Sequence, residues 1–190
     1  MQACHHVHSI LRKKQNLTEH STAMKKLCLN LIFVLGLIVS AVAQEKPTLY
    51  NPSADAKADI AAAVKKAAAE NKHVFLQLGG NWCGWCILFN NLATTNDTLK
   101  TYIEKNYVVV HVNYSKENLN EEVFASLGYP QRFGFPVFVV LDGKGTRLHT
   151  QNSAYLEKGK GHDPKKVLEF LENWAPASID PKTYKPAGKS

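Results

Sequence analysis

The feature that most constrains the fold is a pair of cysteines placed between a buried-strand pattern and a helix pattern. Residues 73–78 read His-Val-Phe-Leu-Gln-Leu, a short apolar run rich in strand formers, and two glycines follow it as a turn. Cys83 and Cys86 come next, in Trp-Cys-Gly-Trp-Cys, and residues 87–93 continue as a helix. The sequence therefore predicts a strand, a turn and a helix, with the cysteines at the start of the helix.

The spacing of the two cysteines suits a disulfide that opens and closes. Residues three apart in the first turn of a helix lie on one face, within reach of a bridge. A bridge that closes so short a loop removes little entropy from the unfolded chain, so stability is a poor reason for it. The helix N-terminus favours a thiolate on the first cysteine. We therefore predict that Cys83 is the exposed attacking thiol and that Cys86, one turn deeper, is the resolving thiol.

Strand and helix patterns alternate along the rest of the chain. Helices are predicted over 55–71, 87–93, 96–105, 118–126 and 163–174, and strands over 73–78, 107–114, 136–141 and 146–150. Asn118 and Glu121 resemble a capping box at the start of the fourth helix. The alternation predicts an α/β fold, a sheet with helices on both faces. We expect a linker over 44–51, a folded domain over 52–174 and a loosely ordered tail over 175–190.

The N-terminal part of the chain carries the pattern of an export signal. Two lysines after Met24 precede an apolar run over 27–39, and small residues follow up to Ala43. The run is shorter than the roughly 20 residues that span a bilayer as a helix. We expect residues 24–43 to be a secretory signal peptide, with a periplasmic or secreted mature protein and no stable membrane insertion after cleavage. An uncleaved anchor is the alternative.

A polar lead, residues 1–23, precedes this signal, and Met24 would itself be a conventional start. We interpret the lead as a segment that is cleaved off or never translated. A Cys/His tract at 4–8 could bind a soft metal. The sequence offers no second ligand cluster to complete a closed site, so we predict no metal centre.

Charge and composition exclude several classes of protein. The formal charge of +7 falls to +3 from residue 44 onward, because five basic residues and one acid precede it. So mild a bias does not indicate a nucleic-acid partner. A chain that is 45% hydrophobic and 21% charged is not collagen-like, wholly disordered or a polytopic membrane protein.

These motifs resemble the thioredoxin superfamily over about residues 52–174. The resemblance rests on the strand before the cysteines, on Trp-Cys-Gly-Trp-Cys at 82–86 and on Gly-Phe-Pro-Val at 134–137. It implies a thioredoxin-like fold, with a central mixed sheet of four to five strands flanked by helices. It also implies that Pro136 is a cis-proline that keeps metal away and lets the backbone of Phe135 pair with substrate.

Two positions depart from the family's pattern. Trp85 stands where the commonest motif has proline, so the redox direction cannot be copied from cytosolic thioredoxin. Gln77 stands where the family often buries an acid that relays a proton to the resolving thiol. The second strand brings His111 to about the position of that acid's lysine partner, which makes His111 a candidate relay. A half-buried structural histidine is the alternative.

Four aromatic side chains are expected near the disulfide. Trp82, Trp85, Phe133 and Phe135 would form a flat apolar patch that suits an extended or partly unfolded protein substrate. Phe133 alternatively packs within its own loop. Trp82, Trp85, Phe135 and Pro136 are therefore the predicted substrate-binding residues.

The leading hypothesis is an exported thiol-disulfide oxidoreductase with no cofactor besides its own disulfide. Its partners would be cysteine-containing exported proteins, with a membrane or soluble thiol as electron donor. A reductase is preferred to an oxidase or isomerase, since the chain lacks the dimerisation domain of known isomerases. The alternatives are a binding or chaperone module with an inert disulfide, and a Cys/His metal carrier.

Overall fold

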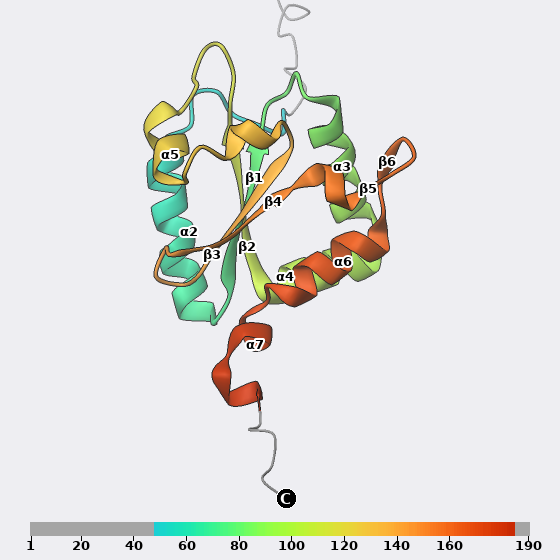
Figure 1. The fold of residues 1–190 in the computed structure, drawn as a ribbon. Coiled ribbons are helices and arrows are strands. Elements are labelled where there is room, and N and C mark those ends of the chain that lie inside the picture. The colour runs from blue at the N-terminus through green and yellow to red at the C-terminus, as the bar shows by residue number, and fades with distance from the viewer. Residues whose placement is uncertain (1–47, 185–190) are drawn as a thin grey trace, which may run out of the picture. The chain divides into compact units, whose positions relative to one another are not determined.

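The computed structural model describes residues 48–184 (Figure 1). The predicted lead and signal peptide, the first half of the linker (44–47) and residues 185–190 lie outside this part of the chain. The helices are α2 (Ala56–Glu70), α3 (Gly84–Thr95), α4 (Asp97–Asn106), α5 (Glu121–Ser126), α6 (Pro164–Asn173) and α7 (Pro176–Ile179). The strands are β1 (His73–Gly79), β2 (Tyr107–Asn113), β3 (Val137–Leu141), β4 (Arg147–Asn152), β5 (Glu157–Lys158) and β6 (Gly161–His162).

Side-chain caps start three of the predicted helices, α2, α4 and α6. Asp55 accepts from the Ala58 amide at the start of α2. Asn96 and Asp163 do the same for α4 and α6, each accepting from a first-turn amide. These bonds satisfy amides that have no partner inside the helix. The helix predictions for these segments are confirmed.

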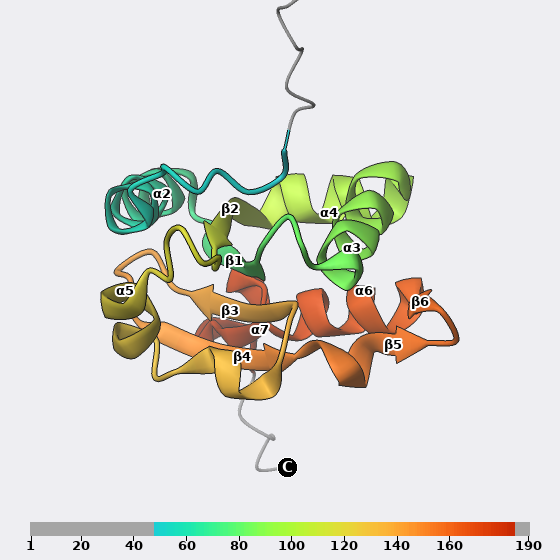
Figure 2. The ribbon, with the colours of Figure 1, turned by 90° about the horizontal axis from the view of Figure 1, so that it is seen from above.

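The central sheet is mixed and has four strands in the order β2-β1-β3-β4 (Figure 2). Strands β1 and β2 are parallel, whereas β1 pairs with β3, and β3 with β4, antiparallel. The predicted mixed sheet is thus confirmed with four strands. Strands β5 and β6 form a separate hairpin in a segment that was expected to be a polar loop.

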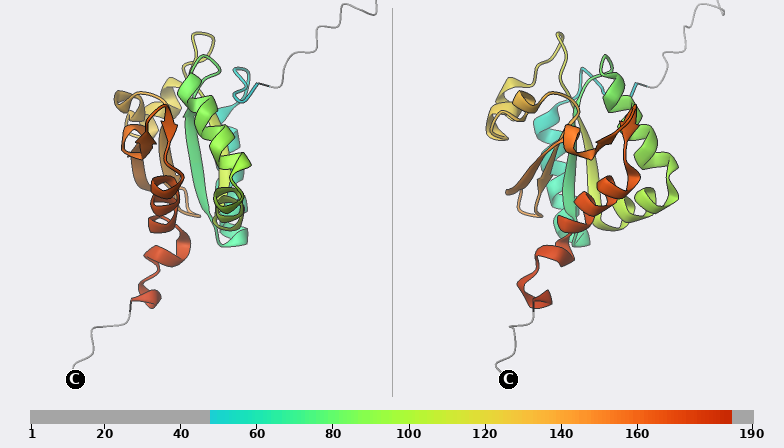
Figure 3. Two further views of the ribbon diagram at one scale, coloured as in Figure 1. Left: turned by 90° about the vertical axis from the view of Figure 1, so that its right-hand side faces the viewer. Right: turned by 45° about the vertical axis from the view of Figure 1, so that its right-hand side comes forward.

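Helices cover both faces of the sheet, as predicted. Alternate residues of β1 divide between two apolar cores: Val74, Leu76 and Leu78 pack with α2 and α5, and Phe75 packs with α3, α4 and α6. Figure 3 turns the α3, α4 and α6 side toward the viewer. Because Gln77 alternates with Leu76 and Leu78, it lies on the Phe75 face of the sheet, where α3 packs.

The capping box predicted for α5 is wrong. The helix begins at Glu121, and its N-cap is Asn120, which makes no side-chain cap bond. Asn120 has a left-handed backbone, with φ of 48°, so the chain turns just before the helix. Asn118 instead accepts from the Asn120 amide and donates to the Pro52 carbonyl. Its side chain therefore fastens this loop to the start of the domain.

Both ends of the domain are more ordered than the sequence suggested. Tyr50, in the predicted linker, is fully buried, so the folded part begins before residue 52. The expected loose tail contains α7 and a short 3-10 turn over Pro181–Thr183. Tyr184 donates from its hydroxyl to the Ser178 carbonyl, which holds this turn against α7.

Candidate active site

The disulfide lies where the end of β1 meets the start of α3. Cys83 is the N-cap of α3, and its sulfur accepts a hydrogen bond from the Cys86 amide at 3.1 Å. The two residues form a disulfide, with their Cα atoms 5.2 Å apart. The first cysteine thus lies at the positive end of the helix, where a thiolate is favoured.

The two sulfurs differ in burial less than the sequence suggested. Cys83 was expected to be exposed, but only 5% of its surface is accessible, against 0% for Cys86. Leu49, Trp85 and Phe135 pack around the pair and account for this burial. Cys83 remains the more accessible of the two.

Gln77 lies buried beneath Cys86 and uses both hydrogens of its amide. Its Nε2 donates to the Cys86 carbonyl at 3.0 Å and to the Tyr50 hydroxyl at 2.9 Å. The structure therefore brings Gln77, which stands in place of the family's buried acid, to the backbone of the second cysteine.

His111 pairs with Gln77 across the β1–β2 register. Its ring meets the Tyr50 ring edge to face, with centroids 5.7 Å apart. Burial lowers the pKa of His111. Its buried Nε2 has no hydrogen-bond partner within residues 48–184. A relay role for His111 stays a prediction, and the structure places the ring beside Tyr50.

Tyr50 is the site residue that the sequence analysis missed. The side chain of Asn81 holds its backbone on both sides: Oδ1 accepts from the Tyr50 amide at 3.0 Å, and Nδ2 donates to the Tyr50 carbonyl at 2.7 Å. Tyr50 then packs directly against both cysteines. The available signal was that Leu49 and Tyr50 are the large apolar residues of an otherwise polar segment.

Gly79 leaves the space in which Tyr50 and Cys86 approach each other. A Cβ added to this glycine would come within 2.5 Å of the Cys86 sulfur and 2.8 Å of the Tyr50 hydroxyl oxygen. Real Cβ atoms do not approach neighbours so closely, so no other residue fits here without a shift of one group. The glycine is needed for this close approach at the end of β1.

Trp82 and Phe135 form the exposed apolar surface beside the disulfide. Trp82 is 60% exposed, and its indole nitrogen donates to the Tyr114 carbonyl at 2.7 Å. Its ring meets Phe135 edge to face at 5.5 Å, and Phe135 in turn packs on Tyr114 at 4.9 Å. The Phe135–Pro136 peptide bond is cis, as predicted.

The other two aromatic residues expected in this patch lie differently. Trp85 packs against the cysteine cluster and meets the His162 ring of β6 edge to face at 5.5 Å. Phe133 lies under the Arg132 guanidinium, 4.2 Å from the ring centroid. The structure thus joins Trp82 with Phe135, whereas Trp85 and Phe133 are held by neighbours of their own.

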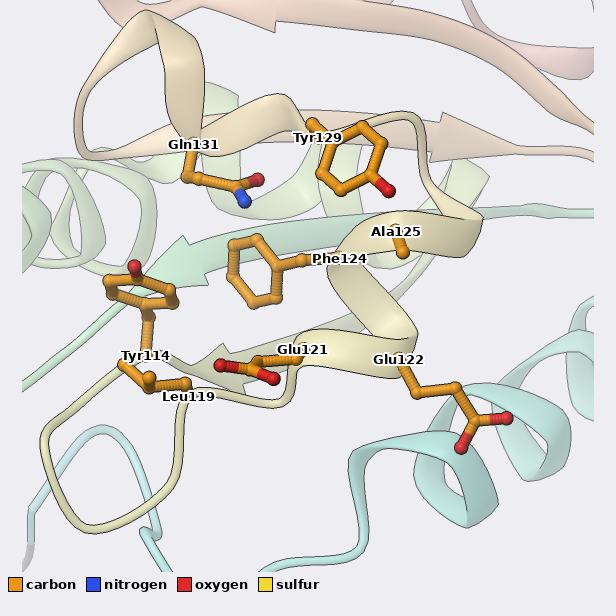
Figure 4. Close-up of a pocket in the computed structure, with 8 residues that line it drawn as sticks. All are labelled: Tyr114, Leu119, Glu121, Glu122, Phe124, Ala125, Tyr129 and Gln131. Atoms are coloured by element: carbon orange, nitrogen blue, oxygen red, sulfur yellow. The ribbon is translucent and has the colours of Figure 1, made fainter.

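A cavity of about 490 Å³ adjoins this surface on the α5 side (Figure 4). It is lined by Tyr114, Leu119, Glu121, Glu122, Phe124, Ala125, Tyr129 and Gln131. Figure 4 shows the Glu121 carboxylate turned toward Tyr114, while Glu122 reaches toward α2, where it pairs with Lys57 at 2.7 Å. Because Tyr114 packs on Phe135, the cavity continues the surface beside the disulfide.

Residues 48–184 contain neither a cluster of metal ligands nor a membrane-spanning helix. No group of three or more His, Cys, Asp or Glu side chains there could hold a metal ion. None of the helices in that range has the length and apolar character needed to cross a membrane.

Comparison with known proteins identifies the fold family. A disulphide isomerase from Xylella fastidiosa Temecula1 is 23% identical and has a TM-score of 0.59, with 66% of this chain and 95% of that chain covered. The DsbH oxidoreductase is 22% identical over 69% of this chain and 92% of that chain, with a TM-score of 0.44. The C-terminal domain of DsbD from Neisseria meningitidis is 18% identical over 62% of this chain and 95% of that chain, with a TM-score of 0.42.

No curated protein matches the sequence. A family model described as thioredoxin-like matches residues 55–143, which contain β1, the cysteine pair and β3. The likeness in fold and this match agree with the motif at the cysteines. Residues 55–143 thus match the thioredoxin-like family, and the described part of the chain has a thioredoxin-like fold.

Proposed function

We propose that this protein is a thiol-disulfide oxidoreductase that exchanges its Cys83–Cys86 disulfide with cysteines of other proteins. One observation carries the proposal: the disulfide joins a helix N-cap residue with some accessible surface to a fully buried partner one turn further on. We expect an incoming thiolate to attack the first sulfur rather than the second, because only the first cysteine has any accessible surface. The bridge is therefore arranged for directional exchange.

The exchange step follows from this asymmetry. A thiolate of the partner protein attacks the Cys83 sulfur, and the bond between the two sulfurs of the site breaks. The electron pair of that bond goes to Cys86, which leaves as a thiolate, and Cys83 is now joined to the partner. In the reverse step the Cys86 thiolate attacks Cys83 and releases the partner's thiolate.

The partner's polypeptide would lie on the surface formed by Trp82 and Phe135. These aromatic rings offer apolar contact beside the more accessible sulfur. An extended segment would pair with the backbone of Phe135, next to Pro136, while Trp85 borders the site from α3. The cavity behind Tyr114 gives room for a side chain that neighbours the reacting cysteine.

We further propose that the protein works outside the cytoplasm and acts as a reductase. Export is supported by the signal-peptide pattern of residues 24–43, and disulfides of substrate proteins persist in such compartments. Its substrates would be exported proteins with cysteines, and a membrane or soluble thiol would return electrons to the site. The disulfide itself is the redox centre.

A disulfide-reduction assay on a model protein tests the function. The full chain with dithiothreitol should accelerate reduction, and Cys83→Ser should abolish the acceleration. Full acceleration by Cys83→Ser would contradict the proposal. A binding or chaperone module would instead keep its affinity for an unfolded client in both proteins and show no acceleration in either. Stoichiometric metal retained after chelation would favour the metal carrier.

A further inference from the structure

We propose that the Tyr50 hydroxyl donates a hydrogen bond to the Cys86 sulfur when the disulfide opens, and so stabilises the buried Cys86 thiolate. This inference rests on the proposed exchange function and assigns a role at that site to a residue from the segment before α2. Tyr50 would be a catalytic residue, because its hydroxyl would contact the leaving sulfur once this bond forms. Gln77 would be a positioning residue that acts through it.

The hydrogen bonds of Gln77 leave the hydroxyl hydrogen of Tyr50 available. The Cys86 carbonyl can only accept, so the Gln77 side-chain nitrogen must face it. The same nitrogen also faces the Tyr50 hydroxyl, whose oxygen is therefore the acceptor of that bond. The hydroxyl hydrogen must point elsewhere, and the described part of the chain gives it no acceptor in the disulfide form.

The Cys86 sulfur is the acceptor that the geometry offers. A Cβ on Gly79 would lie 2.5 Å from this sulfur and 2.8 Å from the hydroxyl oxygen, so the two atoms cannot be further apart than the sum of these distances. Asn81 fixes the Tyr50 backbone by two hydrogen bonds, which keeps the hydroxyl at this place. Reduction turns the neighbouring sulfur into a thiolate, a far stronger acceptor than a disulfide sulfur.

The site needs such a donor because Cys86 has no access to water. A buried anion is costly unless a hydrogen bond satisfies it. Burial raises the pKa of Tyr50 well above its ordinary value, so the hydroxyl keeps its hydrogen throughout the working range of pH. His111, whose ring meets Tyr50 from β2, has a pKa lowered by burial and brings no positive charge near neutral pH.

The role of Tyr50 in exchange is electrostatic, and no proton leaves it. When a partner thiolate attacks Cys83, the electron pair of the broken bond collects on Cys86. A donor held close to that sulfur can form this bond and stabilise the charge as it develops. In the reverse direction the same bond keeps Cys86 ionised and ready to attack.

The titration of Cys86 tests the proposal without any client protein. Thiolate absorbance is measured as a function of pH in the reduced full chain carrying Cys83→Ser. The absorbance of the Cys83→Ser/Cys86→Ser chain is subtracted at each pH, which removes the contributions of the other cysteines and of the tyrosines. Adding Tyr50→Phe should raise the titration midpoint of the Cys86 thiol by about 1 to 2 pH units, the range expected for loss of a hydrogen bond to a charged group.

Tyr107→Phe is the matched control. Like Tyr50, Tyr107 is a buried tyrosine, but it starts β2 at the end of the sheet away from the cysteines, and its hydroxyl donates to the Leu171 carbonyl. The control should leave the Cys86 midpoint unchanged. An equal midpoint shift in both variants, or none in a folded Tyr50→Phe chain, overturns the proposal.

A second variant keeps the test decisive if Tyr50→Phe does not fold. Tyr50→meta-fluorotyrosine preserves the shape of the ring and makes the phenol a stronger donor, so the Cys86 midpoint should fall. An unchanged or raised midpoint overturns the proposal. The titration needs no exchange activity, so its outcome is separate from that of the reduction assay, which tests the proposed function itself.

Discussion

Replacing Gly79 by alanine tests the close approach of Tyr50 and Cys86 most simply. The added methyl group would lie 2.5 Å from the Cys86 sulfur and 2.8 Å from the Tyr50 hydroxyl. Neither group can move aside easily, because the disulfide holds one, and Gln77 and Asn81 hold the other. The substitution must therefore shift packed groups rather than the free end of a flexible side chain.

The magnitude follows from two opposing effects. Overpacking a core costs about 1–3 kcal/mol, whereas replacing a glycine by alanine in a regular element gains roughly 0.5–1 kcal/mol. The difference is about 0–2.5 kcal/mol. Because both clashing groups are held in place, we expect Gly79→Ala to lie in the upper part of this range and to lower the free energy of unfolding of the oxidised protein by about 1–2 kcal/mol. With a urea m-value of about 2 kcal/mol/M, the midpoint should fall by roughly 0.5–1 M.

Gly84→Ala is the control, measured by the same urea titration. Gly84 starts α3, and a Cβ added there meets nothing within 4 Å. Alanine has the better helix propensity, so this variant should be as stable as the parent or slightly more stable. Equal midpoints for Gly79→Ala and the parent would refute the packing described at the end of β1.

Three further outcomes are expected. In the reduced full chain, an alkylating reagent should modify Cys83 before Cys86, as peptide mapping would show, and equal rates would contradict the burial difference. Asn81→Ala should lower the free energy of unfolding by about 1–3 kcal/mol, because it leaves the Tyr50 amide and carbonyl unpaired. An unchanged urea midpoint would show that the two hydrogen bonds from Asn81 to the Tyr50 backbone do not stabilise the fold. Burial lowers the pKa of both His111 and His162, so the unfolded chain takes up protons that the folded chain does not, and stability should fall as the pH drops below about 6.5. His162→Phe should make the dependence of stability on pH shallower. An unchanged slope would show that His162 does not contribute to the loss of stability in acid.

Local patterns were enough to predict most of the framework. The apolar run of β1, the helices α2 and α6 and the position of the cysteines at a helix start all depend on residues close together in the chain. The cis bond before Pro136 followed from resemblance, since nothing local requires it. The strand, the helices and the place of the cysteines agree between sequence and structure because one segment decides each of them.

Features that depend on distant segments could not be predicted in this way. Tyr50 reaches the site through contacts with residues 27 and 31 positions further on, and its own neighbours in the sequence show no strand or helix pattern. Strands of two residues, such as β5 and β6, are too short to show an alternation. The burial of Cys83 likewise depends on Leu49 and Phe135, which come from opposite sides of it in the chain.

The central claim is that Cys83 makes the covalent bond with a partner protein and that Cys86 breaks it. Trapping tests this directly: the reduced Cys86→Ser chain is mixed with an extract of exported proteins, and the cysteine in each mixed disulfide is identified by peptide mapping. We expect reductant-sensitive adducts at Cys83, and none at the site in the matched Cys83→Ser chain. Adducts at Cys86 in the Cys83→Ser chain, or no adduct at Cys83 in a folded Cys86→Ser chain, would contradict the account.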